Sequence, residues 1–582
     1  MIWTSVCLKK HLDMQIQKNK IAFVNPPHAD WCLANCATYL MMQSHYKRFG
    51  KYYDRFEWLE APYKFNQYKS IEEIYNEIPN ADIYLISSYV WNYDLCDLFA
   101  EHVKKVNKNA ICILGGPHIG TNDIEFLKTR TNYDYICQPT KPGEVFIEDF
   151  LNSFIDNNGK VNKEDISWEM NSKKQTKCGL PDYSIYEEHF DYLKKICDYS
   201  KQNKMESFIV LETTRGCPYK CVYCEWGGGL ETKIITKKIE IAKKDISAMK
   251  RAGYTSAFLT DANFGAFEER DLEIFKFAWE QGVNLTDIST MKSKDLTRRK
   301  RLVDCWFEIV GPKKENKNAK QIKNFEWWDK DAGENSISIV PTVAIQSISD
   351  EAMKVSKRID LSSKDKIELS KHIEKQCREK GYPVPALELI LGMPGSTLND
   401  FYDEMELIWN FKAFSHNRHD YMILPDSVLS KKEYLEQYKI QPVKVYTDLI
   451  DEDGVDNLYS LYKTKRNHFY TIQSCYSFTK EDMHEMWFMN QACNILLELI
   501  YPLYENQICP SDFGKECYKI LRMLPEFNDI HNYIIDLFDI NTEPKSIKKI
   551  NGKLRIDVFN EIISNNKHII ISELFKRLNK WI

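Results

Sequence analysis

The stretch TTRGCPYKCVYCEWGGG, residues 213–229, decides the fold and the chemistry. It carries three cysteines, Cys217, Cys221 and Cys224, in a C-x3-C-x2-C spacing. A structural zinc site needs four ligands, normally as two pairs, and no matching C-x-x-C pair follows in the chain. Four-iron clusters ordinarily take four cysteines, so three thiolates would leave one iron without a protein ligand. The spacing therefore favours an iron–sulfur cluster with one open coordination site, and Cys217, Cys221 and Cys224 are its predicted metal ligands.

The 582 residues carry a net charge of −5, which limits the classes of partner. A chain without a broad basic field matches a phosphate backbone poorly, so we expect no nucleic-acid partner. No segment reaches the ~18 uninterrupted apolar residues of a spanning helix, and we find no secretion signal at the N-terminus, so we expect no membrane partner. The 17 cysteines then indicate the reduced thiols of a cytoplasmic protein rather than a disulfide frame.

After an N-terminal extension of residues 1–19, strand-like and helix-like runs alternate over residues 20–150. Helical crossovers between strands imply a buried parallel sheet, whose ligands lie beyond the carboxyl ends of the strands. The expected strands are residues 20–27, 55–62, 82–92, 110–120 and 133–144. The polar composition of residues 151–205 then indicates a linker.

A second α/β series occupies residues 206–425, with strand-like runs at 207–214, 256–262, 338–347 and 386–395. The cysteines follow the first run, which places them at the carboxyl end of a parallel barrel, where such folds keep their active sites. Residues 311–336 form an inserted loop, and residues 426–582 form a mostly helical accessory domain. The predicted fold class is α/β, with a flavodoxin-like (Rossmann-type) domain, a partial TIM-type barrel and a C-terminal helical domain.

A C-x3-C-x2-C motif after a strand, with an aromatic residue (here Tyr223) before the third cysteine, resembles the radical S-adenosylmethionine superfamily. Three later strand ends also resemble that family, namely FLTDANFG (258–265), VAIQSISDEAMKVSKR (343–358) and LELILGMPGST (387–397). The resemblance implies a 4Fe–4S cluster whose open iron chelates S-adenosyl-L-methionine, which one electron cleaves to a 5′-deoxyadenosyl radical. The side chains that it implies around S-adenosylmethionine are Tyr223, Asp261, Asn263, Gln346, Ser347, Arg358 and Glu388.

The N-terminal sheet, in front of such a barrel, resembles the cobalamin-binding domain of the cobalamin-dependent subclass (class B methyltransferase-like enzymes). SSYVWN (87–92), LGGPHIG (114–120) and PGE (142–144) carry this resemblance. Glycines suit a flat macrocycle, because no side chain then lies under it. The implied cobalamin residues are Ser87, Ser88, Gly115, Gly116, Pro117, His118, Gly143 and Glu144. No histidine has an Asp-x-His-x-x-Gly context, so we expect a cobalt without a protein imidazole.

The combined resemblance spans roughly residues 20–500 and implies methylation of an unactivated carbon of a peptide or natural-product small molecule. It also implies an electron donor such as flavodoxin or ferredoxin. Epimerisation or rearrangement on the same scaffold is the alternative reaction, and a cobalamin- or redox-sensing binding protein is the alternative of another class. Cys475 bears on this choice, because a catalytic thiol could donate hydrogen to a substrate radical. Its other interpretation is a thiol packed in the core.

Overall fold

The computed structural model divides into two compact units, residues 1–181 with 450–465 and residues 182–449 with 466–582. Among the residues that the structure describes, no helix is both long and apolar enough to cross a membrane. The described residues are 18–26, 36–64, 68, 70–89, 92–117, 131–137, 142–161, 180–203, 208–224, 234–286, 293–312, 343–382, 384–385, 387–411, 416–424, 427–446, 468–504, 512–537, 549–550 and 553–578.

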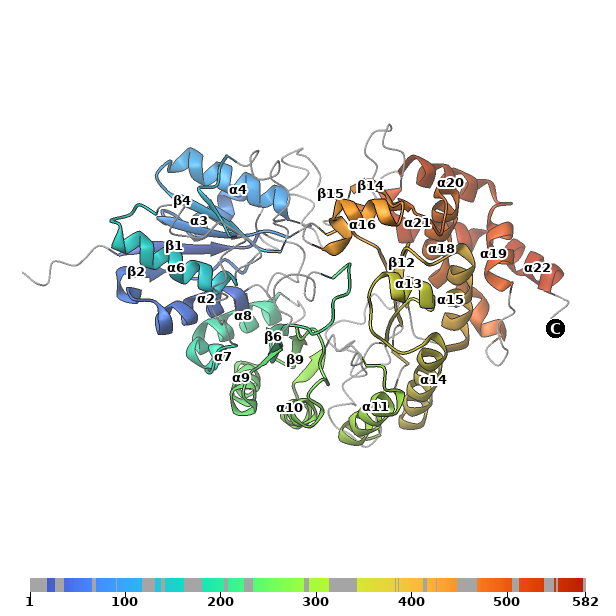
Figure 1. Ribbon diagram of the computed structural model, residues 1–582, viewed down its shortest axis with the longest axis horizontal. Coiled ribbons are helices and arrows are strands. Elements are labelled where there is room, and N and C mark those ends of the chain that lie inside the picture. The colour runs from blue at the N-terminus through green and yellow to red at the C-terminus, as the bar shows by residue number, and fades with distance from the viewer. Residues whose placement is uncertain are drawn as a thin grey trace, which may run out of the picture. The chain divides into compact units, whose positions relative to one another are not determined.

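The first unit contains a five-stranded parallel sheet in the order β2-β1-β3-β4-β5, which confirms the five predicted strands. Helices α3 and α4 cover one face of the sheet, and α2 and α6 pack together on the other (Figure 1). Every residue of β3 is buried, because a central parallel strand is covered on both faces. The elements are β1 (Asn19–Val24), α2 (Cys36–Phe49), β2 (Phe56–Trp58), α3 (Ile71–Glu77), β3 (Ile83–Ser87), α4 (Tyr93–Val106), β4 (Ile111–Gly115), β5 (Tyr135–Ile136) and α6 (Gly143–Asp156).

Six parallel strands of the second unit form two sheets, β10-β9-β6 and β11-β12-β13. Helices α9, α10, α11, α14 and α15 follow one another along the outside, each packed on the next (Figure 1). This alternation in chain order is that of a partial TIM-type barrel. The elements are β6 (Phe208–Leu211), α9 (Ile239–Ala252), β9 (Ser256–Leu259), α10 (Glu268–Gln281), β10 (Asn284–Thr286), α11 (Leu296–Val310), β11 (Val343–Gln346), α13 (Asp350–Val355), α14 (Ser363–Lys380), β12 (Leu387–Leu391), α15 (Leu398–Phe411) and β13 (His416–Asp420).

Two helices, α7 (Ile185–Glu188) and α8 (Phe190–Gln202), lie within the segment 151–205 that was expected to be a linker, and α6 ends in it at Asp156. Helix α8 buries Leu193 and Ile196 and packs against α9. Charged residues separate its apolar ones, so the stretch is polar on average although one face of the helix is apolar. These residues are therefore helical parts of the second unit, and the expectation of a linker is wrong for them. The inserted loop predicted at 311–336 lies almost wholly outside the described residues.

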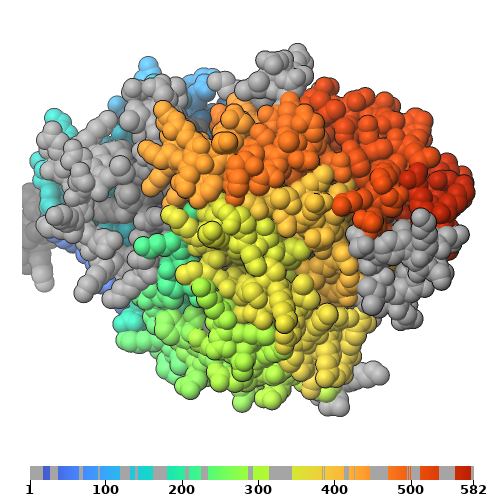
Figure 2. All heavy atoms as spheres, turned by 45° about the vertical axis from the view of Figure 1, so that its right-hand side comes forward, coloured from blue at the N-terminus to red at the C-terminus, as the bar shows by residue number. Residues whose placement is uncertain are grey.

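The chain after residue 426 is mostly helical, as expected, but it also contains an antiparallel pair, β14 with β15, that the sequence did not predict. One apolar core runs from Leu391, the last residue of β12, and Met393 after it to Trp487 and Phe488 of α18. Accordingly, the later part of the barrel (yellow), the β14–β15 region (orange) and the C-terminal helices (red) lie next to one another in Figure 2. The elements are β14 (Gln441–Tyr446), β15 (His468–Ser474), α16 (Lys432–Gln437), α18 (Lys480–Tyr504), α19 (Phe513–Leu521), α20 (Pro525–Leu537), β16 (Lys549–Ile550), β17 (Lys553–Leu554), α21 (Arg555–Asn565) and α22 (Lys567–Leu578).

Two adjacent glycines at the end of β4 should differ in their tolerance of a side chain. Gly116 has φ +103°, and a Cβ there would lie 2.3 Å from the Ser88 carbonyl oxygen. A Cβ on Gly115 would meet Cys137 Cβ at an ordinary 3.7 Å. We expect Gly116→Ala to lower the free energy of unfolding by about 2–4 kcal/mol, through backbone strain and overpacking. We expect Gly115→Ala, the matched control, to change it by less than about 1 kcal/mol. Urea unfolding measures both, and equal losses would contradict this account.

Candidate functional site

The cysteine loop begins where β6 ends. Gly216, with φ +88°, turns the chain in a left-handed conformation directly before the first cysteine. Cys217 and Cys221 are 3% and 4% exposed, and Cys224 is half-buried. The backbone N–H of Cys224 donates to the Cys221 carbonyl at 3.1 Å. The three predicted metal ligands therefore lie in one short, largely buried segment at the carboxyl end of a parallel strand.

A small antiparallel ladder closes the base of this loop. β7 (Thr214–Arg215) precedes the cysteines and pairs with β8 (Ile235–Thr236), which follows them. The Lys237 backbone N–H donates to the Thr213 carbonyl at 2.8 Å. The Arg270 guanidinium donates to the carbonyls of Thr213 and Lys237 at 2.8 and 2.9 Å. The chain thus enters and leaves the loop at one fixed place.

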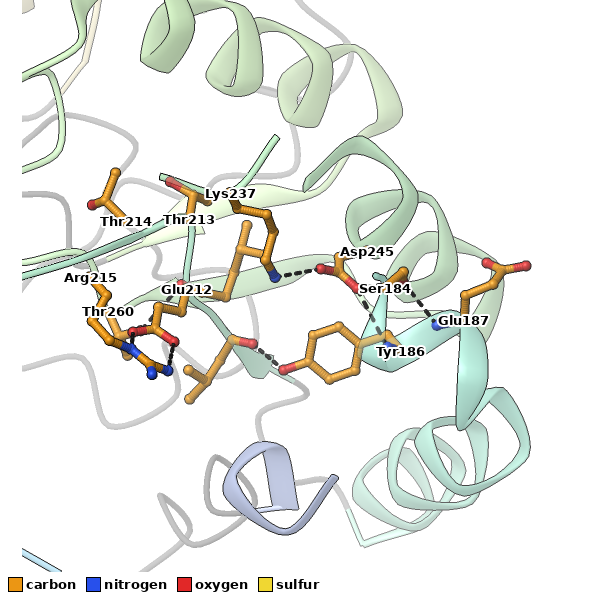
Figure 3. Close-up of polar contacts among 12 residues, drawn as sticks. Ser184, Tyr186, Glu187, Glu212, Thr213, Thr214, Arg215, Lys237, Asp245 and Thr260 are labelled. Atoms are coloured by element: carbon orange, nitrogen blue, oxygen red, sulfur yellow. Dashed lines mark hydrogen bonds and ion pairs between the residues drawn. The ribbon is translucent and has the colours of Figure 1, made fainter. Parts of the chain in front are cut away.

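A buried ion pair anchors the chain that leaves the loop. Lys237 Nζ lies 2.8 Å from Asp245 Oδ2, and the two side chains are 3% and 0% exposed. Figure 3 shows the Ser184 hydroxyl on the second Asp245 oxygen, to which it donates at 2.5 Å. Both carboxylate oxygens are therefore engaged. Removing one partner of a buried pair leaves an uncompensated charge, so this pair holds β8 against α9.

Asp261, predicted to face S-adenosylmethionine, holds the turn between β6 and the cysteine loop. Its Oδ1 accepts the backbone N–H groups of Thr213 and Thr214 at 2.6 and 3.0 Å. Its Oδ2 accepts the Thr213 hydroxyl. Burial raises the pKa of Asp261 to about 6, although these hydrogen bonds oppose the shift. The structure therefore gives this residue a defined part in positioning the loop, and contact with a cofactor stays a prediction.

Three of the residues predicted around S-adenosylmethionine come together beside the cysteine loop. Arg358 Nη1 donates to the Tyr223 hydroxyl at 3.1 Å, and its Nη2 donates to the Ala344 carbonyl at 2.9 Å. The Tyr223 hydroxyl in turn lies 3.4 Å from Gln346 Oε1. Gln346 has φ +65° where the β11–β12 register shifts, an unusual conformation for a residue other than glycine. Tyr223, which stands between two of the cysteines, thereby joins the loop to the end of β11.

Ser347 belongs to a buried network of hydrogen bonds that the sequence analysis did not predict. Its hydroxyl donates to Glu404 Oε1 at 2.9 Å, and Arg418 Nη2 donates to Glu404 Oε2 at 3.1 Å. The Glu404 and Arg418 side chains are 4% and 0% exposed. Burial raises the pKa of Glu404, although Arg418 opposes the shift. Charged residues occur on most helices and strands, so the sequence did not indicate that Glu404 and Arg418 are buried and paired with each other.

The other predicted residues of the second unit lie near strand ends. Asn263 is buried after β9, and Glu388 is half-buried in β12, where it aligns with Ala344 of β11. Cys475 follows β15, and its Sγ lies 3.2 Å from the Ser477 hydroxyl oxygen. That oxygen also accepts the Gly395 backbone N–H at 2.9 Å. Cys475 is therefore connected to the turn after β12, and it also packs against the apolar core that includes Met483 and Trp487.

Buried polar groups gather at the carboxyl edge of the sheet in the first unit. The Asn92 side-chain amide donates to Asn25 Oδ1 at 2.6 Å and to the Ser87 carbonyl at 3.3 Å. The Ser88 Oγ and Asn25 Nδ2 atoms are buried without a hydrogen-bond partner among the described residues. Unpaired buried polar atoms suit a ligand that would supply the partner. Asn25 was not predicted, although an Asn at a strand end, before two prolines, is a signal that could have found it.

The glycines predicted to lie beneath a corrin ring have packing reasons of their own. Gly116 lets the Ser88 backbone approach, and a Cβ on Gly143 would lie 3.2 Å from Met42 Cε on α2. Pro117 is exposed, whereas Glu144 is buried in the first turn of α6. Gly115 is the glycine of this group with room for a side chain. His118 lies outside the described residues. Contact of these residues with cobalamin stays a prediction.

The three thiols suit an iron–sulfur cluster by residue type. The buried Arg358 guanidinium interacts electrostatically with Cys221, and a neighbouring cation favours a thiolate ligand. Across the described ranges, no group of three or more His, Cys, Asp and Glu side chains already surrounds one metal position.

Comparisons with known proteins point to one group of enzymes, although no family model matches the chain. The cobalamin-dependent radical SAM methyltransferase TokK of Streptomyces tokunonensis is 24% identical over 419 residues, which are 68% of this chain and 56% of TokK. The 2-(S-pantetheinyl)-carbapenam-3-carboxylate methyltransferase of Streptantibioticus cattleyicolor is 22% identical over 391 residues, which are 65% of this chain and 52% of that enzyme. The chain thus matches little more than half the length of these two curated relatives.

The solved structures agree over almost the whole chain. The radical S-adenosylmethionine methyltransferase TsrM of Kitasatospora setae superposes with a TM-score of 0.54 at 11% identity, over 96% of this chain and 99% of TsrM. This chain has the fold of the cobalamin-dependent radical S-adenosylmethionine enzymes. The cobalamin-dependent enzyme OxsB gives a TM-score of 0.53 at 12% identity, over 98% of this chain and 82% of OxsB. The resemblance predicted from the cysteine motif and the strand ends is confirmed.

The raised pKa of Asp261 predicts a pH dependence of stability. In the unfolded chain an Asp titrates near pH 4, so the unfolded state releases this proton first as the pH rises. The free energy of unfolding of the wild type should therefore fall relative to that of Asp261→Asn between about pH 4 and about pH 6, and the difference should then stay constant. Urea unfolding of both proteins over this range measures the difference. A difference that grows in favour of the wild type would show that the folded chain prefers the carboxylate.

Proposed function

We propose that this protein is a cobalamin-dependent radical S-adenosylmethionine methyltransferase that acts on an unactivated carbon of a peptide or small natural product. The observation that carries the proposal is the cysteine loop, in which three thiols follow β6 and Tyr223 meets Arg358 from beyond β11. Both curated relatives are named as methyltransferases, which supports the reaction class. The names of these relatives do not identify the substrate of this protein.

Each cofactor has a candidate place on the chain. Cys217, Cys221 and Cys224 would hold a 4Fe–4S cluster. S-adenosylmethionine would lie beside the side chains predicted for it, at the carboxyl ends of the barrel strands. Cobalamin would lie at the carboxyl edge of the sheet in the first unit. When bound, the cluster and S-adenosylmethionine supply a carbon radical, and cobalamin supplies a methyl group. TsrM with cobalamin and a 4Fe–4S cluster, and OxsB with aqua-cobalamin, provide the precedent for this set of cofactors.

The side chains of this protein would bind and orient these groups. Arg358 is buried and fixed by the Ala344 carbonyl, so its guanidinium is oriented before any ligand arrives. Cys217 and Cys221 are buried, which would limit the access of water to a cluster bound there. In the first unit, Ser88 Oγ can donate or accept a hydrogen bond and Asn25 Nδ2 can donate one, which suits the polar groups of a large ligand. An electron donor such as flavodoxin or ferredoxin in the cytoplasm would complete the system.

Epimerisation is a second candidate because of the position of Cys475. Its thiol is half-buried and lies 3.2 Å from Ser477, which binds the turn behind β12. A thiol near the carboxyl end of a barrel strand could give hydrogen to a substrate radical. Methyl transfer quenches the radical without a thiol, so epimerisation would require the Cys475 thiol and methylation would not.

Replacement of Cys217, Cys221 or Cys224 by Ala should abolish the iron–sulfur absorption and the reductive cleavage of S-adenosylmethionine together, because each variant loses one of three protein ligands. Absorption spectra of anaerobically reconstituted protein and chromatography of the nucleoside products measure the two effects. Cys305→Ala, which changes a half-buried thiol on α11 outside the loop, is the matched control and should keep both. A loop variant with full cleavage activity would refute the cluster assignment.

Cys475→Ala separates the two reactions. For a methyltransferase we expect most turnover to remain, S-adenosylhomocysteine to be formed, and stability to fall by about 1–2 kcal/mol from the packing change. For an epimerase the variant would still form deoxyadenosine but would release no inverted product. Product analysis in heavy water makes the distinction. Solvent deuterium in the wild-type product, absent with Cys475→Ala, would contradict the methyltransferase proposal.

A further inference from the structure

A buried ionic group lies directly behind the cysteine loop. Asp360 uses both carboxylate oxygens, with Oδ1 2.6 Å from Arg299 Nη1 and Oδ2 2.9 Å from Arg358 Nε. The three side chains are between 1% and 4% exposed. Burial opposes ionisation of Asp360, but the two guanidinium groups hold its pKa below the usual value. Two cations thus share one carboxylate in a place largely closed to water.

A third cation lies beside this group. Lys366 Nζ donates to the carbonyls of Ile345 and Ser347 at 3.0 and 2.9 Å, and the residue is 2% exposed. Burial lowers the pKa of Lys366 to about 8, although Asp360 opposes the shift. Backbone carbonyls orient this ammonium but carry no net charge. The region behind the loop is therefore positive even before Lys366 is included, since Arg299 and Arg358 together outnumber Asp360.

The contact between Arg358 and Tyr223 places this positive charge close to the predicted metal ligands. Tyr223 stands between Cys221 and Cys224 in sequence, and its hydroxyl accepts from Arg358 Nη1 at 3.1 Å. Arg358 also interacts electrostatically with Cys221. Charges act more strongly on each other in a buried site than in water, and they are screened less by salt. Reduction potentials of iron–sulfur clusters depend on nearby charge and on solvent exposure.

We propose that the Arg299–Asp360–Arg358 group sets the reduction potential of the cluster held by the cysteine loop, an inference that rests on the proposed function. One-electron reduction adds one negative charge at the loop, and the surplus positive charge behind it stabilises that added charge. The group thereby makes the cluster easier to reduce. Asp360 moderates this effect, while Arg299 and Arg358 produce it.

The test compares variants that change the charge in opposite directions. Asp360→Asn removes a negative charge, and Arg358 keeps its bonds to Ala344 and Tyr223, so the midpoint potential should shift to a less negative value. Arg299→Gln removes a positive charge without touching Tyr223, so the potential should shift to a more negative value. The midpoint potential is measured on the reconstituted full chain without S-adenosylmethionine, by titration with dithionite followed by electron paramagnetic resonance.

Lys354→Gln is the matched control, because it removes a positive charge from a side chain that is 81% exposed. Solvent screens that charge, so its potential should equal that of the wild type. A purely structural role of the ionic group would lower iron content in both test variants without shifts of opposite sign. That result, or shifts of the same sign, would overturn the inference while the wild-type cluster still supports the proposed function. A wild-type chain that takes up no cluster would remove both proposals.

Discussion

The closed base of the cysteine loop is the constraint on which the rest of the site depends. The β7–β8 ladder and the bond between Lys237 and Thr213 bring together two points of the chain that are more than twenty residues apart. Closing a loop of this length costs conformational entropy, and the ladder, Arg270 and Asp261 offset that cost outside the cysteines themselves. The two ends of the loop that carries the cysteines can therefore be held together without a metal that orders the whole segment.

The barrel topology brings residues that are distant in sequence to this loop. Parallel strands present their carboxyl ends on the same edge, so the end of β11 and the segment after it bring Gln346 and Arg358 to the edge where the cysteines follow β6. The buried charges at this edge are paired within the protein, as Glu404 with Arg418 and Asp360 with two arginines. Unpaired charges would be costly there, so the pairs also fix the side chains that surround the loop.

The first unit shows why a motif glycine needs a structural explanation before a ligand is assigned to it. Gly116 and Gly143 have close neighbours within the unit, whereas Gly115 has room. Ser88 Oγ and Asn25 Nδ2, which are buried and have no hydrogen-bond partner within the part of the chain that the structure describes, are a better guide to a ligand, because a buried polar atom loses free energy unless something bonds to it. Both atoms belong to residues at strand ends, where ligands of such sheets bind.

The sequence by itself determined most of the element types, the parallel sheet and the three-cysteine motif, because apolar periodicity and ligand spacing are local properties, but it missed α7, α8 and the β14–β15 pair. It also indicated Tyr223, Gln346 and Arg358, which the structure brings together. Only the tertiary structure decided that Ser347 bonds to Glu404, that Asp261 holds the turn, and that Arg299 and Asp360 stand behind Arg358. Apart from the Arg358–Asp360 pair, whose residues are two positions apart, these contacts join residues about fifty or more positions apart, and each depends on burial and side-chain direction, which no local pattern records.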